Sequence, residues 1–177
     1  GPRALYLALE RFVREEHGGP RMEARFVSNV DPDDPNDVLR RVDLEATLFV
    51  LVSKSGTTQE TLTNAAFVRE KMAGSGVHGL DPRKHMVAVT GEDSPLARDE
   101  GFLEVFFVDD FIGGRYSSSS AVGGTLLTLS FGKKVFEDFL NGAHEADRLG
   151  LDPDITKNAC LLDALIGVYE RNVLGYP

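Results

Sequence analysis

Hydroxyl side chains crowd into one short stretch in the first third of the sequence. Between positions 53 and 61, five of the nine residues are serine or threonine: Ser53, Ser55, Thr57, Thr58 and Thr61. Within the same stretch, Lys54 adds a positive charge, and Gly56 lets a ligand approach the backbone closely. A phosphate monoester has several acceptor oxygens, which a loop rich in hydroxyl donors can satisfy. The stretch therefore predicts a site for phosphate or a sugar phosphate.

The position of this stretch favours the same chemistry. It follows an apolar run at 47–53 and precedes a helical pattern at 59–73. Free N–H groups at the start of a helix, together with the helix dipole, attract anions. Ligands of open parallel sheets also bind at the carboxyl ends of the strands. The alternative is a capping box, because Thr57 and Glu60 have the spacing that caps a helix without any ligand.

A second candidate element is Gly113-Gly114-Arg115, which is followed by Tyr116 and a run of four serines. The two glycines free the backbone, so that Arg115 can project into a cleft. A guanidinium grips an oxyanion with paired donors and could stabilise an enediolate as its charge develops. The alternative is a glycine-rich turn with a solvated arginine and a serine N-cap.

Strand and helix patterns alternate along the chain and must position these two elements. Short apolar or β-branched runs predict strands at 24–30, 47–53, 85–90 and 101–108. Helical spacing is found at 5–13, near 35–42, at 59–73, and in three later segments at 118–131, 135–148 and 154–174. This order predicts an α/β fold with a parallel sheet, right-handed crossovers, flanking helices and a C-terminal helical segment.

Composition narrows the classes of protein. A length of 177 residues fits one domain. The formal charge of −9 argues against nucleic acid or an anionic membrane as the main partner. The single cysteine, Cys160, excludes a disulfide framework and a cysteine-based zinc site, and the four histidines are too scattered to suggest a metal. No apolar run approaches a membrane span and no signal peptide leads the chain, so we expect a cytoplasmic protein.

Taken in order, these motifs resemble the phosphoglucose isomerase family. The resemblance rests on the 53–61 stretch and on Gly113-Gly114-Arg115-Tyr116-Ser117, and it extends to shorter matches at 26–31, 62–65, 142–144, 158–159 and 174–177. It covers nearly the whole chain. It implies one domain of the sugar isomerase (SIS) type over residues 1–177, with a flavodoxin-like three-layer arrangement and a helical extension from about residue 118.

The resemblance also implies a reaction, the interconversion of glucose 6-phosphate and fructose 6-phosphate through an enediolate. No metal or organic cofactor is expected. The positions that match the family's phosphate-binding loop are Ser53, Ser55, Thr58 and Thr61, with Lys54 adjacent, and Arg115 matches the arginine that steadies the enediolate. The resemblance further implies a homodimer in the full-length protein.

Two features limit what the resemblance predicts for this chain alone. Many family members have a threonine and an aromatic residue where this chain has Ser55-Gly56, a form also found in other SIS-type domains. The family's glycine-rich loop and its catalytic glutamate should lie outside positions 1–177, so we expect an internal fragment with little or no isomerase activity. The alternatives are a non-catalytic sugar-phosphate sensor, a domain acting on another phosphosugar, and an ordinary α/β domain with capped helices.

Overall fold

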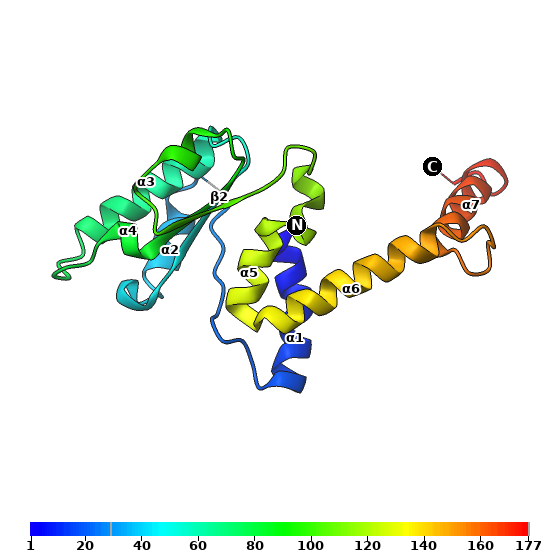
Figure 1. The fold of residues 1–177 in the computed structure, drawn as a ribbon, viewed down its shortest axis with the longest axis horizontal. Helices are drawn as coiled ribbons and strands as arrows, with labels where there is room; N and C mark the ends of the chain where they lie inside the picture. Colours follow the sequence, from blue (N-terminus) through cyan, green and yellow to red (C-terminus); the bar gives the residue numbers. More distant parts are fainter. Residues whose placement is uncertain (29, 177) are drawn as a thin grey trace. The chain divides into compact units, whose positions relative to one another are not determined.

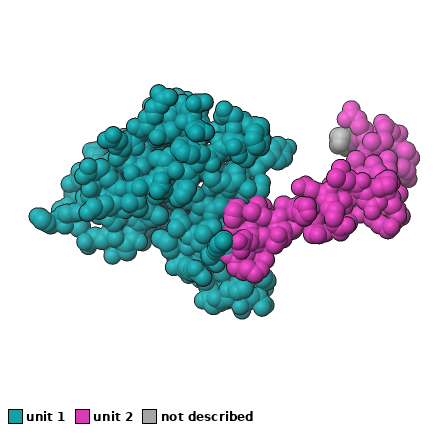
Figure 2. Space-filling model, viewed as in Figure 1, with its two compact units in different colours: residues 1–133 teal, residues 134–177 magenta. Residues whose placement is uncertain are grey.

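A computed structural model describes residues 1–28 and 30–176, which form two compact units (Figures 1 and 2). Unit 1 comprises Gly1–Lys133 and contains the sheet, and unit 2 comprises Lys134–Pro177 and is helical. None of the helices within the described ranges is long and apolar enough to cross a bilayer.

The sheet of unit 1 has three parallel strands in the order β1-β2-β3. They span Phe49–Ser53, Met86–Thr90 and Glu104–Phe107. Ser53 pairs with Thr90, and Thr90 pairs with Phe107, so the three strands end at the same edge. Every residue of β2 is buried, as expected for a central strand that is apolar on both faces. The parallel sheet predicted from the alternating pattern is confirmed.

Helices cover both faces of this sheet. On one face, Ala65 of α3 (Gln59–Ala73) packs with Leu51 and Met86. On the other, Val122 of α5 (Ala121–Phe131) packs with Val89. The first helix, α1 (Pro2–His17), contacts α5 and ends at a left-handed Gly18 (Figure 1). The remaining short helices of this unit are α2 (Asp33–Leu39), η1 (Leu44–Ala46), α4 (Pro82–His85), η2 (Pro95–Arg98) and η3 (Gly114–Ser119).

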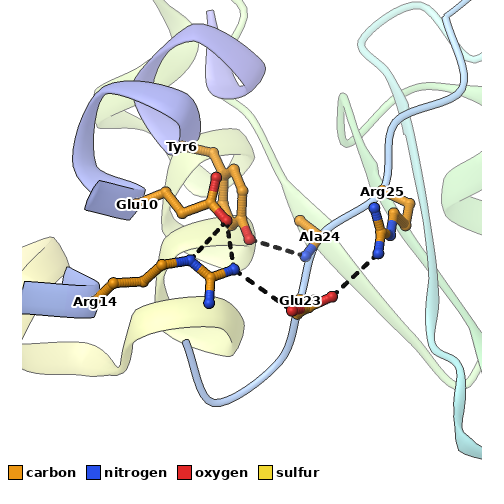
Figure 3. A network of polar contacts seen from close by, with 6 residues as sticks. All are labelled: Tyr6, Glu10, Arg14, Glu23, Ala24 and Arg25. Carbon is orange, nitrogen blue, oxygen red and sulfur yellow. Dashed lines mark hydrogen bonds and ion pairs between the residues drawn. The ribbon is translucent and has the colours of Figure 1, made fainter. Parts of the chain in front are cut away.

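The strand predicted at 24–30 is wrong over its described residues. Residues 24–28 run without a neighbouring strand, and Asn29 lies outside the described residues. Two groups of this segment instead contact Tyr6 of α1. The Ala24 N–H donates to the Tyr6 hydroxyl at 3.2 Å (Figure 3). The Phe26 ring packs edge-on against the Tyr6 ring. The aromatic residue of this segment, Phe26, thus packs on α1 and not in the sheet.

Charged side chains reinforce the same attachment. Arg14 pairs with Glu10 of its own helix at 2.7 Å and reaches Glu23 at 3.5 Å (Figure 3). Glu23 in turn pairs with Arg25 at 3.2 Å. These exposed ion pairs link α1 to the segment that leads towards the sheet, although each one alone adds little stability.

Unit 2 consists of α6 (Lys133–Gly150), which begins at the unit boundary, and α7 (Ala159–Asn172). The helix predicted at 154–174 begins later than expected, because Asn158 caps it by accepting from the Leu161 N–H at 2.9 Å. The amide nitrogen of buried Asn158 donates to the carbonyls of Gly150 and Asp152, at 2.9 and 2.8 Å. One side chain thus closes the loop between the two helices.

Candidate functional site

The hydroxyl-rich stretch crosses from the end of β1 to the start of α3. The hydroxyl of Ser53, the last residue of β1, donates to the Thr58 hydroxyl at 3.0 Å. Between them, the Gly56 N–H donates to the Ser53 carbonyl at 3.1 Å. The Ser55 hydroxyl accepts from the N–H and the hydroxyl of Thr57, at 3.2 and 3.0 Å. The loop therefore curls so that its hydroxyls lie in two adjacent pairs.

The helix that follows has no side-chain cap. Its N-cap residue is Thr58, and the Thr58 side chain makes no capping hydrogen bond to the helix. A capping box requires the N-cap hydroxyl to bind the N–H three residues later. A capping box on Thr57 and Glu60 needs Thr57 as the N-cap, but the helix begins one residue later and the Thr57 hydroxyl binds Ser55, so the structure contradicts that alternative. Thr61 lies in the first turn of this helix.

Two residues that were not identified from the sequence, Thr90 and Ser94, support the loop through hydrogen bonds and packing. Thr90, fully buried at the end of β2, donates its hydroxyl to the Ser53 carbonyl at 2.7 Å and shares a 2.5 Å hydrogen bond with the buried Ser94 hydroxyl. Ser94 also explains Gly56, whose φ is +67° and whose added Cβ would lie 2.9 Å from the Ser94 oxygen. The sequence signal that could have identified Thr90 is a polar residue at the end of a buried strand.

The Gly113-Gly114-Arg115 element follows β3 and forms the start of η3, with Gly113 as its N-cap. The Arg115 side chain is exposed, and among the described residues its guanidinium has no hydrogen bond or ion pair. The Ser117 hydroxyl donates to the Gly114 carbonyl at 2.8 Å, and Ser120 caps α5 by accepting from the Val122 N–H at 3.2 Å. The serine N-cap of the alternative interpretation is thus present, beside an arginine that is free to bind an anion.

Lys54 joins the two elements. Its Nζ donates to the carbonyl of Asp110, and to the carbonyl of Ile112 at 3.0 Å. Both carbonyls belong to the segment that leads into Gly113. The structure therefore assembles Ser53, Ser55 and Thr58 in one loop, and attaches the Arg115 segment to that loop through Lys54.

Two surface hollows lie away from the hydroxyl-rich stretch and Arg115. One hollow of about 250 Å³ lies between Asn36 and Ser75, and another of about 360 Å³ lies beside Tyr6 and Arg14. Neither of these two hollows includes a residue of the 53–61 stretch or Arg115, and the candidate site is defined by its hydrogen-bond donors. Within the described part of the chain, no three His, Cys, Asp or Glu side chains are arranged to hold a metal ion.

Known proteins match this chain over its whole length. The family model for phosphoglucose isomerase matches residues 1–177. The glucose-6-phosphate isomerase of Treponema pallidum is 57% identical over 176 residues, and that of Treponema denticola is 54% identical over 175. Each alignment covers 99% of this chain and 32% of the relative.

A solved structure agrees. The crystal structure of a glucose-6-phosphate isomerase from Chlamydia trachomatis superimposes with a TM-score of 0.86 at 43% identity, covering 99% of this chain and 32% of that one. The chain thus spans about a third of the length of the relatives that it matches. The full-length family match, the identities and the shared fold together show that this chain belongs to the phosphoglucose isomerase family.

Proposed function

We propose that the whole protein interconverts glucose 6-phosphate and fructose 6-phosphate, and that this chain supplies the phosphate-binding loop and an enediolate-stabilising arginine. Relatives that carry the name glucose-6-phosphate isomerase support the reaction. The observation that carries the phosphate site is the uncapped start of α3, flanked by the paired hydroxyls of its loop.

The hydrogen bonds of the loop suit an incoming phosphate. In the structure the hydroxyls of Ser53 and Thr58 bind each other, as do those of Ser55 and Thr57. A phosphate oxygen replaces such neutral pairs with charge-assisted hydrogen bonds, which are roughly twice as strong. The first turn of α3 adds free N–H groups and the positive end of the helix dipole, and Thr61 adds a further hydroxyl.

Arg115 provides the second half of the proposal. Moving a proton between C1 and C2 of the open-chain sugar places negative charge on the two oxygens of an enediolate. A guanidinium without an ion-pair partner can stabilise that charge as it develops. Glu60 lies in the first turn of α3, in the phosphate-binding element. The family resemblance implies that a glutamate outside these 177 residues carries out the proton transfer, and the proposal includes that assignment.

The test is a thermal-shift titration of this chain with 6-phosphogluconate, with gluconate and inorganic phosphate as controls. A ligand that binds only the folded state adds about 2.7 kcal/mol at a hundred times its Kd. We expect stabilisation by 6-phosphogluconate and not by gluconate, and loss of that shift in Thr58→Ala and Ser55→Ala. Thr63→Ala, on the same helix but beyond the loop, is the matched control.

Equal shifts in Thr58→Ala and in the unmodified chain would contradict the phosphate site. The whole protein is assayed in parallel for isomerisation, because phosphate binding without turnover would favour a non-catalytic sugar-phosphate sensor. The proposal includes little or no turnover by this chain alone. It also includes a cytoplasmic location and a homodimer. Sedimentation of the whole protein tests the homodimer.

A further inference from the structure

The side chain of Lys54 binds groups outside the loop in which it lies. A lysine inside a phosphate-binding loop is expected to add its charge to the anion. Here its ammonium donates instead to the carbonyls of Asp110 and Ile112, which lie 56 and 58 residues further along the chain. Both of these hydrogen bonds would have to break before Nζ could bind a phosphate in its own loop.

We propose that Lys54 is a positioning residue that holds the Arg115 segment against the phosphate loop, and is not itself a phosphate ligand through its side chain. The inference rests on the proposed function, because it assigns Lys54 a role in placing Arg115 relative to the bound sugar phosphate.

The position of Lys54 lets one residue contact the segments that follow all three strands. Lys54 comes directly after β1, and its carbonyl accepts from the Gly91 N–H, just after β2, at 2.9 Å. A Cβ on Gly91 would lie 2.9 Å from that carbonyl, so the glycine permits the contact. The Lys54 side chain then reaches the segment after β3. Since β2 lies between β1 and β3, the side chain bridges the end of the central strand.

The ammonium suits the groups that it meets. Asp109 to Ile112 forms a turn, closed by the Ile112 N–H donating to the Asp109 carbonyl at 3.1 Å. The carbonyls of Asp110 and Ile112 both accept from Nζ, and an ammonium with three N–H donors serves the two at once. Only Gly113 and Gly114 separate this anchored turn from Arg115.

The two glycines do not fix Arg115 by themselves. A Cβ on Gly114 would meet nothing within 4 Å, and one on Gly113 would meet only the Tyr116 ring at 3.7 Å. On its far side the segment is anchored to α5, where a Cβ on Gly123 would lie 1.8 Å from the Ser118 carbonyl. Arg115 therefore lies between two anchors, and Lys54 provides the one that faces the phosphate loop.

The experiment measures steady-state kinetics of the whole isomerase carrying Lys54→Met. We expect kcat to fall by about tenfold or more, because small misplacements of a charge-stabilising group are costly. The inhibition constant of inorganic phosphate should change by less than about threefold, since the loop's hydroxyls remain. Thr58→Ala should show the reverse pattern. Lys84→Met, on an exposed lysine of α4, is the control for loss of a positive charge.

A double variant tests whether Lys54 acts through Arg115. In the Arg115→Ala background, Lys54→Met should cause no further loss of kcat, because the group that it positions is gone. Lys54→Arg should restore part of the activity, since a guanidinium can also donate to two carbonyls. If Lys54→Met does not fold, Lys54→Gln is used, because it keeps a donor without the charge. In that variant kcat should fall by a smaller factor, and phosphate inhibition should again stay nearly unchanged.

Three outcomes overturn the inference. One is weaker phosphate inhibition in Lys54→Met, as large as in Thr58→Ala, which would make Lys54 a ligand. Another is a double variant whose fold-loss of kcat equals the product of the losses in Lys54→Met and Arg115→Ala, which would show that the two residues act independently. The third is an unchanged kcat. A failure of the proposed function is distinguishable, because the unmodified protein would then neither isomerise the sugar phosphate nor respond to inorganic phosphate.

Discussion

The loops after β1 and β3 are built in opposite ways. The loop after β1 is held by hydrogen bonds from its own hydroxyls and from buried Thr90, and its Gly56 is surrounded by Ser94 and Pro95. The segment after β3 has a glycine pair with open space around it, and it ends at an exposed Arg115.

This difference matches the two tasks that we propose. A phosphate group has the same shape and charge before and after the reaction, so a rigid, preorganised loop can bind it throughout. An enediolate exists only during the reaction, so the charge that stabilises it must be placed relative to a sugar that is already bound. Rigidity in the first loop and external anchoring of the second follow from these requirements.

The largest expected effect separates the two loops by function. Arg115→Ala in the whole isomerase should lower kcat by about a hundredfold, the usual cost of losing a group that stabilises developing charge. Inhibition by inorganic phosphate should stay nearly unchanged, as measured in the same steady-state assay. Arg40→Ala, at an exposed arginine that ends α2, is the control. A parallel loss of phosphate inhibition would show that phosphate binding and enediolate stabilisation are not separated between the two loops.

A smaller effect tests the contrast in backbone freedom. Gly56→Ala should destabilise this chain by about 1–3 kcal/mol, because alanine is strained at φ +67° and its methyl group would meet Ser94. Gly114→Ala should leave stability unchanged or raise it by up to about 1 kcal/mol, since open space surrounds that site and alanine restricts the unfolded chain. Urea unfolding of both variants measures the difference. Equal free energies of unfolding would remove the distinction between the loops.

The smallest effect lies at the opposite end of the sheet, just before β2. Hydrogen bonds from Arg83 hold the pKa of the Asp81 carboxyl below its ordinary value of 3.8. In acid, the unfolded chain therefore binds this proton before the folded chain does. The stabilising contribution of Asp81 is present above a pH of about 4 and is lost as the pH falls through the lower, folded-state pKa.

Asp81→Asn keeps the helix cap to the Arg83 N–H and removes the charge. The unfolding midpoint of the variant should be slightly below that of the unmodified chain near a pH of about 6, and the two should converge in stronger acid. Phosphate binding should be the same in both proteins. A widening difference in acid would contradict the lowered pKa.

Local pattern predicted much of the fold. The helix at 59–73 has the expected bounds, and three of the four predicted strands form within their expected ranges. Residues 24–28 of the strand predicted at 24–30 form no strand, and instead the Ala24 N–H and the Phe26 ring bind Tyr6. The late start of α7 escaped prediction for a related reason, since Asn158 binds the preceding loop as well as the helix.

Some residues of the candidate site could likewise be predicted from the sequence, and others could not. The hydroxyls of Ser53, Ser55 and Thr58 were recognised because they lie close together in the sequence, between a strand and a helix. Thr90, Ser94 and the partners of Lys54 were not, because they lie about 40 to 60 residues further along the chain and reach the loop only when parallel strands end at one edge.

The sequence by itself determined the parallel α/β unit, the hydroxyl-rich loop and the resemblance to phosphoglucose isomerases, since each depends on residue types at short spacing. Only the tertiary structure decided that α3 begins without a side-chain cap, that Thr90 supports the loop, and that Lys54 binds the segment before Arg115. The physical reason is that polar side chains at a sheet edge have several possible partners, and which one they bind depends on how neighbouring strands are aligned.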